Sequence, residues 1–302
     1  MARWVSKGKR IEVFLKVAED LGIDAVVLAN YFHEHAKYAI KAMKKGIAVL
    51  SETTAAPSLG ECVQLVEAYE ETKTKYMLGA NCVFWRVVQA MRRVMNEGKF
   101  GRAVFGDFAR KKTVGHAKAF ALVEMDNGSM INYSGCTGAG SLSKWYRLAC
   151  ETGTIESVRY DQSEYKLIEC GAHDDPTITE HTWTSSGTLN AEEEAILNKS
   201  MSSDSEHGGV PHGGVDFALL VHFLKFLRDE EQPFFDVYHA VSLSATGILA
   251  WYSMLTDNRK FDIPDFRIKE ERDKVRDDFR MPFAQRYDDL TLPCRYEEGF
   301  EI

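Results

Sequence analysis

The sequence predicts an α/β protein in which a parallel sheet covered by helices precedes a second domain with a mostly antiparallel sheet. Over residues 11–100, helix-like and strand-like stretches alternate, which is typical of parallel strands joined by crossover helices. Beyond Arg102 the strand-like stretches follow one another around turn residues, which is typical of hairpins. A chain of 302 residues, 45% of them hydrophobic, is long enough to bury the cores that this plan requires.

The first half is predicted from the period of its apolar residues. Strands are predicted at 25–29, 47–50 and 76–79, and helices at 11–21, 33–45, 58–72 and 87–97. Gly46 and Gly98 follow two of these helices and end them. Ser58, with Glu61 three residues later, predicts a capping box at the start of a third.

In the second half, the predicted helices and strands no longer alternate. Strands are predicted at 103–108, 119–125, 129–134, 145–149, 154–160 and 165–170, and helices at 216–228 and 237–256. Asp126-Asn127-Gly128 predicts a hairpin turn, and residues 171–214 are predicted to be long loops with one short acidic helix. From Asp265 a charged tail is expected on the surface. The predicted domains are 1–101, 102–267 and 268–302.

Composition excludes several classes of function. The 37 basic residues are outnumbered by 45 acidic ones, which argues against nucleic acid or an anionic membrane as partner. No apolar stretch approaches the roughly 20 residues of a membrane-spanning helix. The six cysteines form no CxxC motif and no export signal is evident, so we expect reduced thiols in a cytoplasmic protein.

Polar residues follow each of the three predicted parallel strands. Asn30, Glu52 and Asn81 stand directly after them, and ligands of open α/β sheets bind beyond the carboxyl ends of the strands. Amide and carboxylate groups there can hold the hydroxyls of a ribose or a sugar. The alternative is that Asn30 and Glu52 cap the turns that follow.

Histidines supply further candidates at two places in the sequence. His33 and His35 flank Glu34, but no third ligand stands at a defined spacing, so we predict no metal and place them in a pocket or turn. His212 lies in a glycine-rich stretch before Asp216, where it can serve as an acid or base. The alternative for that stretch is a flexible loop ending in a helix cap. No GxGxxG, GxxxxGK[ST] or GxSxG motif occurs.

The run DAVVLANYFHEHAKYAIKAMKKGIAVLSETTAAPSLGECVQLVEAYEETKTKYMLGANC resembles the second half of the Rossmann domain of the glucose–fructose oxidoreductase / inositol dehydrogenase / MocA (Gfo/Idh/MocA) family. The segments EMDNGSM, KWYRLACETGTIE, HGGVDF and FFDVYHAVSLSATGILAWYSMLTDNRKFDIPDF look like that family's C-terminal domain. The resemblance covers about residues 11 to 267, and its strength lies in the joint order of the motifs.

The resemblance implies a partial Rossmann-like domain and hydride transfer between NAD or NADP and a sugar, polyol or related hydroxyl compound. Asn30, His33 and His35 would lie near the cofactor. Glu52 matches the acidic residue of the family's Glu-Lys-Pro motif near the nicotinamide ribose. Thr53 and Asn81 would position the substrate oxygen, with Asn81 also near the cofactor, and His212 would relay a proton. Homo-oligomers through open sheet faces are expected.

Three departures from the family keep other functions open. The opening βαβ unit with its glycine-rich fingerprint is missing, and Thr53 stands where the family has lysine. The segment that carries the family's catalytic histidine is shortened to one that holds His116. One alternative is a non-catalytic, truncated homologue serving as a ligand-binding or assembly subunit. Another is a glycoside-processing relative that uses the cofactor transiently.

Overall fold

The chain falls into two compact units in the computed structural model. The structure describes residues 15–18, 20–110, 118–136, 145–158, 164–169, 177–182, 191–192, 195 and 214–281. Unit 1 comprises residues 1–80 and 220–302, and unit 2 comprises residues 81–219. The end of the chain thus joins the first strands in one unit. The division into three consecutive domains at residues 101 and 267 stays a prediction.

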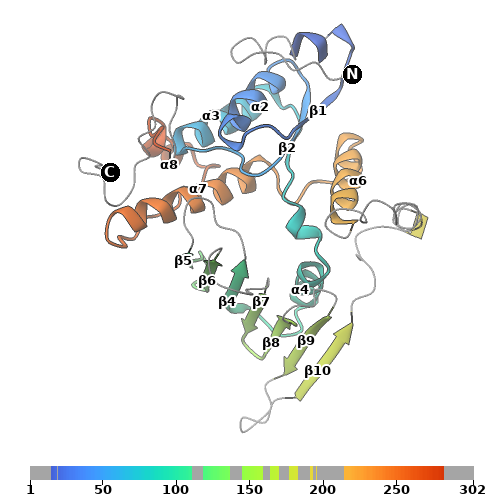
Figure 1. Ribbon diagram of the computed structural model, residues 1–302, viewed down its shortest axis with the longest axis vertical. Coiled ribbons are helices and arrows are strands. Elements are labelled where there is room, and N and C mark those ends of the chain that lie inside the picture. The colour runs from blue at the N-terminus through green and yellow to red at the C-terminus, as the bar shows by residue number, and fades with distance from the viewer. Residues whose placement is uncertain are drawn as a thin grey trace. The chain divides into compact units, whose positions relative to one another are not determined.

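Unit 1 is built on a parallel sheet of three strands, β1 (Ala25–Leu28), β2 (Ala48–Ser51) and β3 (Tyr76–Leu78), in the order β1-β2-β3 (Figure 1). Helix α2 (His35–Met43) connects the first two strands and α3 (Leu59–Thr72) the next two. All four residues of β2 are buried, as expected for the central strand of a covered parallel sheet. The predicted order of strands and helices is confirmed.

The start of α3 departs slightly from the predicted capping box. The Ser58 hydroxyl oxygen accepts a hydrogen bond from the Glu61 backbone N–H (3.3 Å), as predicted. The Glu61 carboxylate accepts from the Ser58 hydroxyl itself (3.1 Å), where a capping box would reach the Ser58 backbone N–H. Burial raises the pKa of Glu61, and the charge of Lys37 and the Ser58 hydrogen bond oppose that rise.

Helix α7 (Val237–Leu255) packs against α3 and β3. The predicted charged tail follows it, and residues 265–281, which we call the strap, are firmly attached to unit 1. The strap contains the short helices α8 (Lys269–Arg272) and η5 (Asp273–Val275). Phe266 is only 1% exposed and Arg272 only 5%, so these two side chains anchor the strap, whereas residues 267–270 are exposed as expected for a segment on the surface.

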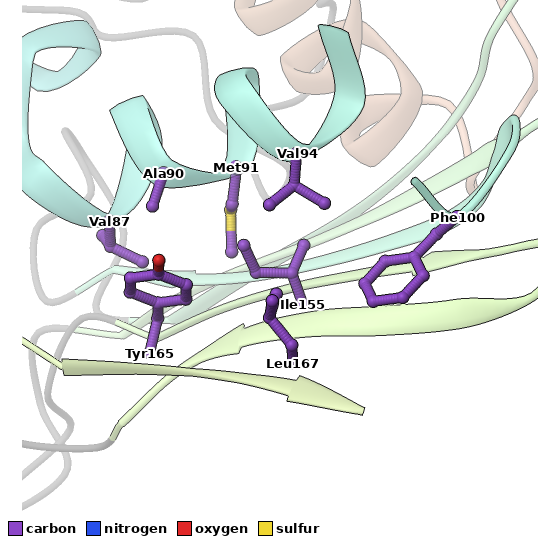
Figure 2. Packing of buried hydrophobic residues seen from close by; sticks show 8 residues of the cluster. All are labelled: Val87, Ala90, Met91, Val94, Phe100, Ile155, Tyr165 and Leu167. Carbon is purple, nitrogen blue, oxygen red and sulfur yellow. The ribbon is translucent and has the colours of Figure 1, made fainter. Parts of the chain in front are cut away.

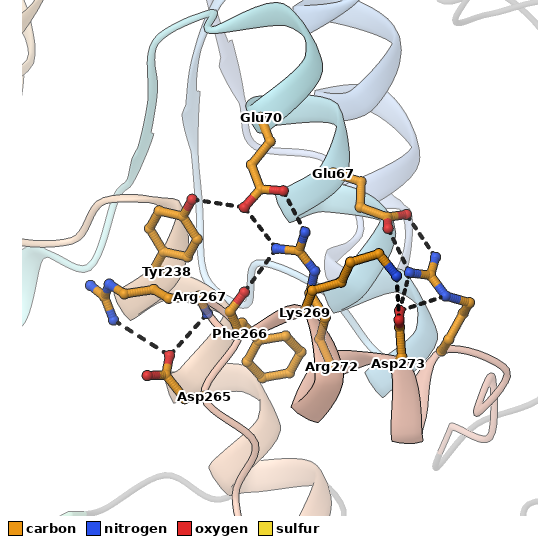
Figure 3. A network of polar contacts seen from close by, with 10 residues as sticks. Glu67, Glu70, Tyr238, Asp265, Phe266, Arg267, Lys269, Arg272 and Asp273 are labelled. Atoms are coloured by element: carbon orange, nitrogen blue, oxygen red, sulfur yellow. Dashed lines mark hydrogen bonds and ion pairs between the residues drawn. The ribbon is translucent and has the colours of Figure 1, made fainter.

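Ion pairs fasten the strap to α3 (Figure 3). The Arg272 guanidinium donates to the Glu70 carboxylate (2.7 Å) and to the Phe266 carbonyl (3.0 Å). The Tyr238 hydroxyl donates to Glu70 as well (3.0 Å). Hydrogen bonds from Arg272 hold the pKa of Glu70 below its usual range, whereas burial and Glu70 raise the pKa of Tyr238 to about 12. One turn earlier along α3, Arg276 donates to Glu67 (2.9 and 2.6 Å).

Unit 2 combines helix α4 (Arg86–Asn96) with a seven-stranded sheet of order β10-β9-β8-β7-β4-β6-β5. Its strands are β4 (Ala103–Arg110), β5 (Lys118–Glu124), β6 (Met130–Cys136), β7 (Trp145–Cys150), β8 (Gly153–Ser157), β9 (Glu164–Glu169) and β10 (Thr177–Thr182). All neighbours are antiparallel except β4 and β6, which confirms the predicted mostly antiparallel sheet. Strand β10 lies where we predicted loops; its polar sequence TITEHT carries no apolar alternation, and pairing with β9 makes it a strand.

Helix α4 covers one face of this sheet (Figure 2). Its apolar side chains meet Ile155 of β8 and Tyr165 and Leu167 of β9. Tyr146 of β7 packs against the same cluster. Because successive residues of a strand face opposite sides, its neighbours Trp145 and Arg147 lie on the other face, as predicted.

Helix α6 (Val215–Leu227) was predicted at 216–228, and the division between the two units, after residue 219, falls within it. In the part of the chain that the structure describes, no helix is long and apolar enough to cross a membrane.

We predict that Ile155→Ala destabilises unit 2 by about 3 to 4 kcal/mol, because the side chain is fully buried between α4 and the sheet. Urea unfolding followed by tryptophan fluorescence measures the loss. Met125→Ala is the control, since Met125 is 42% exposed and should lose less than about 0.5 kcal/mol. Equal losses in the two variants would contradict the packing.

Candidate functional site

Exposed polar and aromatic side chains lie directly after β1. Asn30 is exposed, and its amide donates a long hydrogen bond to the neighbouring Tyr31 carbonyl (3.4 Å). The Tyr31 side chain is 72% exposed and stacks on the His33 ring at 5.9 Å between centroids, where the short helix η1 (Phe32–Glu34) begins. The sequence prediction named Asn30 and His33 but missed Tyr31, whose signal is an aromatic residue directly following a strand-end asparagine.

The turn after β2 presents the second pair of candidates. Glu52 and Thr53 are exposed, and neither side chain makes a hydrogen bond or ion pair with another residue that the structure describes. The Glu52 backbone N–H donates to the Leu28 carbonyl (2.8 Å), which ties this turn to the end of β1. The structure therefore brings the Asn30 and Glu52 turns together at one edge of the sheet and leaves the Glu52 carboxylate free to accept hydrogen bonds.

His35 joins these two turns from inside the protein. Its ring is 1% exposed, with Nδ1 2.9 Å from the Thr54 carbonyl oxygen and Nε2 3.1 Å from the Asn30 carbonyl oxygen. A carbonyl only accepts, so the tautomer of the ring decides which of these two carbonyls receives the hydrogen bond. Both nitrogens of His35 face backbone carbonyls, and the residue can serve a ligand only by holding Asn30 and the 52–54 turn in place.

Two contacts from distant parts of the chain also hold this turn, and the sequence prediction missed both. The Ala55 backbone N–H donates to the Ser244 hydroxyl of α7 (3.1 Å), and the Gly60 N–H donates to the Asp278 carbonyl of the strap (2.7 Å). Both partners are more than 180 residues away in sequence, and no local pattern connects them to the turn.

These contacts decide which part of a dinucleotide the turns can hold. A helix N-terminus cradles a phosphate through free backbone N–H groups. At α3 the N–H groups of Gly60, Glu61 and Cys62 are all bonded within the protein, to Asp278, the Ser58 side chain and the Ser58 carbonyl. The exposed Glu52 and Asn30 fit the hydroxyls of a ribose, whereas the start of α3 does not fit a pyrophosphate.

The third strand-end residue belongs to unit 2. The Asn81 amide donates to the Asp216 carboxylate of α6 (2.7 Å), at the start of the short helix η2 (Asn81–Phe84). This bond joins the turn after β3 to the first turn of α6. His212 lies outside the described residues, as does His116. Within the described ranges, no group of three or more His, Cys, Asp or Glu side chains could hold a metal ion.

Two family models match the chain in succession. Residues 6–80 match the oxidoreductase family, NAD-binding Rossmann fold model of Gfo/Idh/MocA proteins. This part of the chain is therefore similar to the Rossmann domain of Gfo/Idh/MocA oxidoreductases. Residues 143–270 match the C-terminal domain of glycosyl hydrolase 109. NAD, the cofactor that the sequence predicted alongside NADP, is the one that the description of the matched Rossmann domain names.

Two curated proteins are similar to parts of this chain. A glycosyl hydrolase family 109 protein from Stenotrophomonas maltophilia (strain K279a) is 35% identical over 89 residues, which are 30% of this chain and 20% of the relative. An alpha-N-acetylgalactosaminidase from Tannerella forsythia is 29% identical over 121 residues, 40% of this chain and 25% of the relative. The matches thus span a quarter or less of these relatives' length.

Solved structures share the fold. Levoglucosan dehydrogenase, solved in complex with NADH and L-sorbose, aligns with a TM-score of 0.67 at 12% sequence identity. The alignment covers 87% of this chain and 84% of that one. At this identity the likeness concerns the fold alone, and it confirms the predicted fold class of a partial Rossmann-like domain followed by a mostly antiparallel α/β domain.

We predict that His35→Phe loosens the 52–54 turn while keeping a ring in the cavity. Losing a buried hydrogen bond of about 1 kcal/mol should lower the free energy of unfolding of unit 1 by about 1 kcal/mol. Chemical denaturation measures this loss, and hydrogen exchange should rise at residues 54–56. His33→Phe, on a half-exposed ring, is the matched control. Unchanged hydrogen exchange at residues 54–56 in His35→Phe would show that the His35 ring does not hold the turn.

Proposed function

We propose that this chain binds the nicotinamide–ribose part of NAD(H) or NADP(H) at the turns after β1 and β2, and acts at a hydroxyl-bearing carbon of a sugar, polyol or glycoside. The match to the NAD-binding Rossmann family carries the proposal. The free Glu52 carboxylate at the carboxyl end of β2 supports it, since this is where open α/β sheets bind their ligands.

Each candidate residue has a role in this proposal. Glu52 accepts hydrogen bonds from ribose hydroxyls, and the exposed Asn30 amide supplies a donor and an acceptor beside it. Tyr31 and His33 offer an aromatic surface next to them. His35 is a positioning residue that holds both turns.

A bound nicotinamide would supply hydride transfer to or from a carbon that carries a hydroxyl. The chain would supply the groups that hold and move the substrate proton. The Thr53 hydroxyl can hydrogen-bond the substrate oxygen, but it cannot act as the cationic acid that a lysine would be. Asn81 would help to position that oxygen and His212 would relay the proton.

The kind of reaction distinguishes two versions of the proposal. A dehydrogenase releases reduced cofactor in step with oxidised sugar. A glycoside-processing enzyme that uses the cofactor transiently cleaves a glycosidic bond without net reduction. The match of residues 143–270 to the glycosyl hydrolase 109 C-terminal domain favours the glycoside version as a second candidate. A non-catalytic subunit, the remaining alternative, would bind a ligand without turnover. The cytoplasmic location of the protein stays a prediction.

We expect NADH and NADPH titrations by calorimetry to show saturable micromolar binding of at least one nucleotide. Glu52→Gln should weaken this binding about tenfold, because a charge-assisted hydrogen bond to ribose contributes about 1.5 kcal/mol. Glu71→Gln, on an exposed carboxylate at the far end of α3, should leave the affinity unchanged. Two assays then distinguish the reaction types. Incubation with sugars is followed by the absorbance of the nicotinamide, and incubation with p-nitrophenyl glycosides is followed by the release of nitrophenol.

The result could contradict the proposal in two ways. No binding of either nucleotide by the folded chain would reject a nucleotide site in this chain. Binding that Glu52→Gln leaves unaltered would place the nucleotide elsewhere.

A homo-oligomer through the sheet of unit 2 is also proposed. Five charged residues lie opposite one another on neighbouring strands and alternate in sign across the face away from α4: Asp107, Arg147, Glu156, Lys166 and Glu180. Large apolar side chains beside this charge row stay exposed, Phe120 at 76% and Ile178 at 55%.

The alternating row is complementary to a second copy of itself. A two-fold axis parallel to the strands and between β7 and β8 sets Arg147 of one copy opposite Glu156 of the other. It sets Asp107 opposite Lys166 as well, so that every facing pair of charges attracts. Two sheets stacked in this way lie about 10 Å apart, within reach of long charged side chains.

Exchanging one pair of charges tests this interface. The double variant Lys166→Glu/Glu180→Lys keeps an ion pair like the observed one within the sheet (2.6 Å) but sets like charges opposite each other between copies. We expect wild type to sediment as an oligomer and this variant as a monomer. Lys44→Glu/Glu71→Lys, which exchanges a surface pair of unit 1, is the control. A variant that associates like wild type would exclude this face.

A further inference from the structure

The turn that carries Glu52 is held at successive points by different elements of unit 1. Its first residue bonds the end of β1 through the Glu52 N–H (2.8 Å), and its middle is held by His35. Ser244 of α7 holds the Ala55 N–H (3.1 Å), and the strap holds the Gly60 N–H (2.7 Å). The residues of the strap that meet Gly60 lie beyond residue 270, where the second matched family model ends.

Gly60 lets the strap approach the first turn of α3 closely. A Cβ at this position would lie 2.8 Å from the Arg276 carbonyl oxygen and 2.8 Å from a ring carbon of Phe279. Because one of these neighbours is backbone, a methyl group at residue 60 must displace the strap. The residue is helical, and alanine is a better helix former than glycine, so the helix itself does not resist the change.

Helix α7 links the strap to the other end of the turn. The Tyr252 hydroxyl donates to the Asp278 carboxylate (2.9 Å), and the Arg280 guanidinium lies 4.6 Å from the centre of the Tyr252 ring. Two turns earlier on the same helix, Ser244 binds Ala55. The strap and the Glu52 turn therefore share one rigid support.

Two ion pairs attach the strap to α3. The Arg272–Glu70 pair is largely buried on the arginine side, which is 6% exposed. The Arg276–Glu67 pair is more open, with side chains 35% and 37% exposed, and it lies nearer Gly60. Arg276 also pairs with Asp273 within the strap. Loss of Arg276 would thus loosen the end of the strap that touches α3 while Arg272 still anchors its start.

We propose that residues 276–280 of the strap are a positioning segment for the 52–60 turn, so that seating of the strap on Gly60 sets the affinity of the nucleotide site. This inference rests on the proposed function for its consequence in binding. Its structural part, that the strap orders the turn, concerns the ligand-free protein alone. The two parts are therefore tested separately.

Gly60→Ala displaces the strap, and Gly247→Ala is its matched control. Gly247 is also a helical glycine, but nothing lies within 4 Å of an added Cβ there. In the ligand-free protein, we expect Gly60→Ala to raise hydrogen exchange at residues 52–60 and 276–280 about tenfold or more, and Gly247→Ala to leave both segments unchanged. Unchanged exchange at 52–58 in Gly60→Ala would overturn the positioning role.

The binding measurement follows on the same proteins with NADH or NADPH as the probe. We expect Gly60→Ala to weaken binding about tenfold, a coupling of ordinary size for a residue that touches no ligand. Equal affinity of Gly60→Ala and wild type would overturn the claim that the strap sets affinity. If wild type binds neither nucleotide, the proposed function fails, whereas the exchange experiment still decides whether the strap orders the turn.

A second pair of variants covers the case in which Gly60→Ala does not fold. Arg276→Gln removes the ion pairs to Glu67 and Asp273 without adding bulk, and should raise exchange at 52–60 to a smaller extent. Arg276→Lys keeps the charge and should restore most of the protection. Protection that is the same in Arg276→Gln and Arg276→Lys would contradict the role of this anchor.

Discussion

The backbone at the start of α3 is buried, and every polar group there must find a partner inside the protein. Ser58 and Leu59 are at most 1% exposed, and a buried N–H without an acceptor costs about 1 to 3 kcal/mol. Side chains close to the turn satisfy only part of this demand. The Gly60 N–H finds its acceptor in the Asp278 carbonyl, and the Ala55 N–H finds its acceptor in the Ser244 hydroxyl. Both α7 and the strap are therefore needed to satisfy the backbone between β2 and α3.

That constraint explains why residues 265–281 pack against α3. The strap carries two arginines that match two glutamates on one face of α3, and it passes Gly60 at a distance that only glycine allows. Hydrogen bonds from Arg276 hold the pKa of Glu67 below its usual range, as Arg272 does for Glu70. The carboxylates thus stay charged and bound to the strap at neutral pH. The turn that carries Glu52 is thus held by residues that lie far from it in the sequence.

The same contacts limit the chemistry of the site. At the N-terminus of α3 the N–H groups of Gly60, Glu61 and Cys62 are bonded to Ser58 and the strap, so in the proposed site recognition depends on the side chains of Glu52 and Asn30. These groups suit hydroxyls, which a ribose and a sugar both present. Unit 2 presents a different kind of surface. One face of its sheet is an apolar core against α4, and the other combines alternating charges with exposed apolar side chains.

The order of the elements follows from local patterns in the sequence, and the same patterns predict the candidate site residues. The apolar period placed β1 to β3 and their helices, Ser58 marked the start of α3, and the strand ends identified Asn30 and Glu52. These features depend on residues near one another in the chain, where spacing alone has physical meaning. The tertiary structure alone showed that His35 faces two carbonyls, that Ser244 and the strap complete the turn, and that β10 is a strand. Each of these depends on a partner that folding brings from elsewhere in the chain, so no local pattern of residues encodes it.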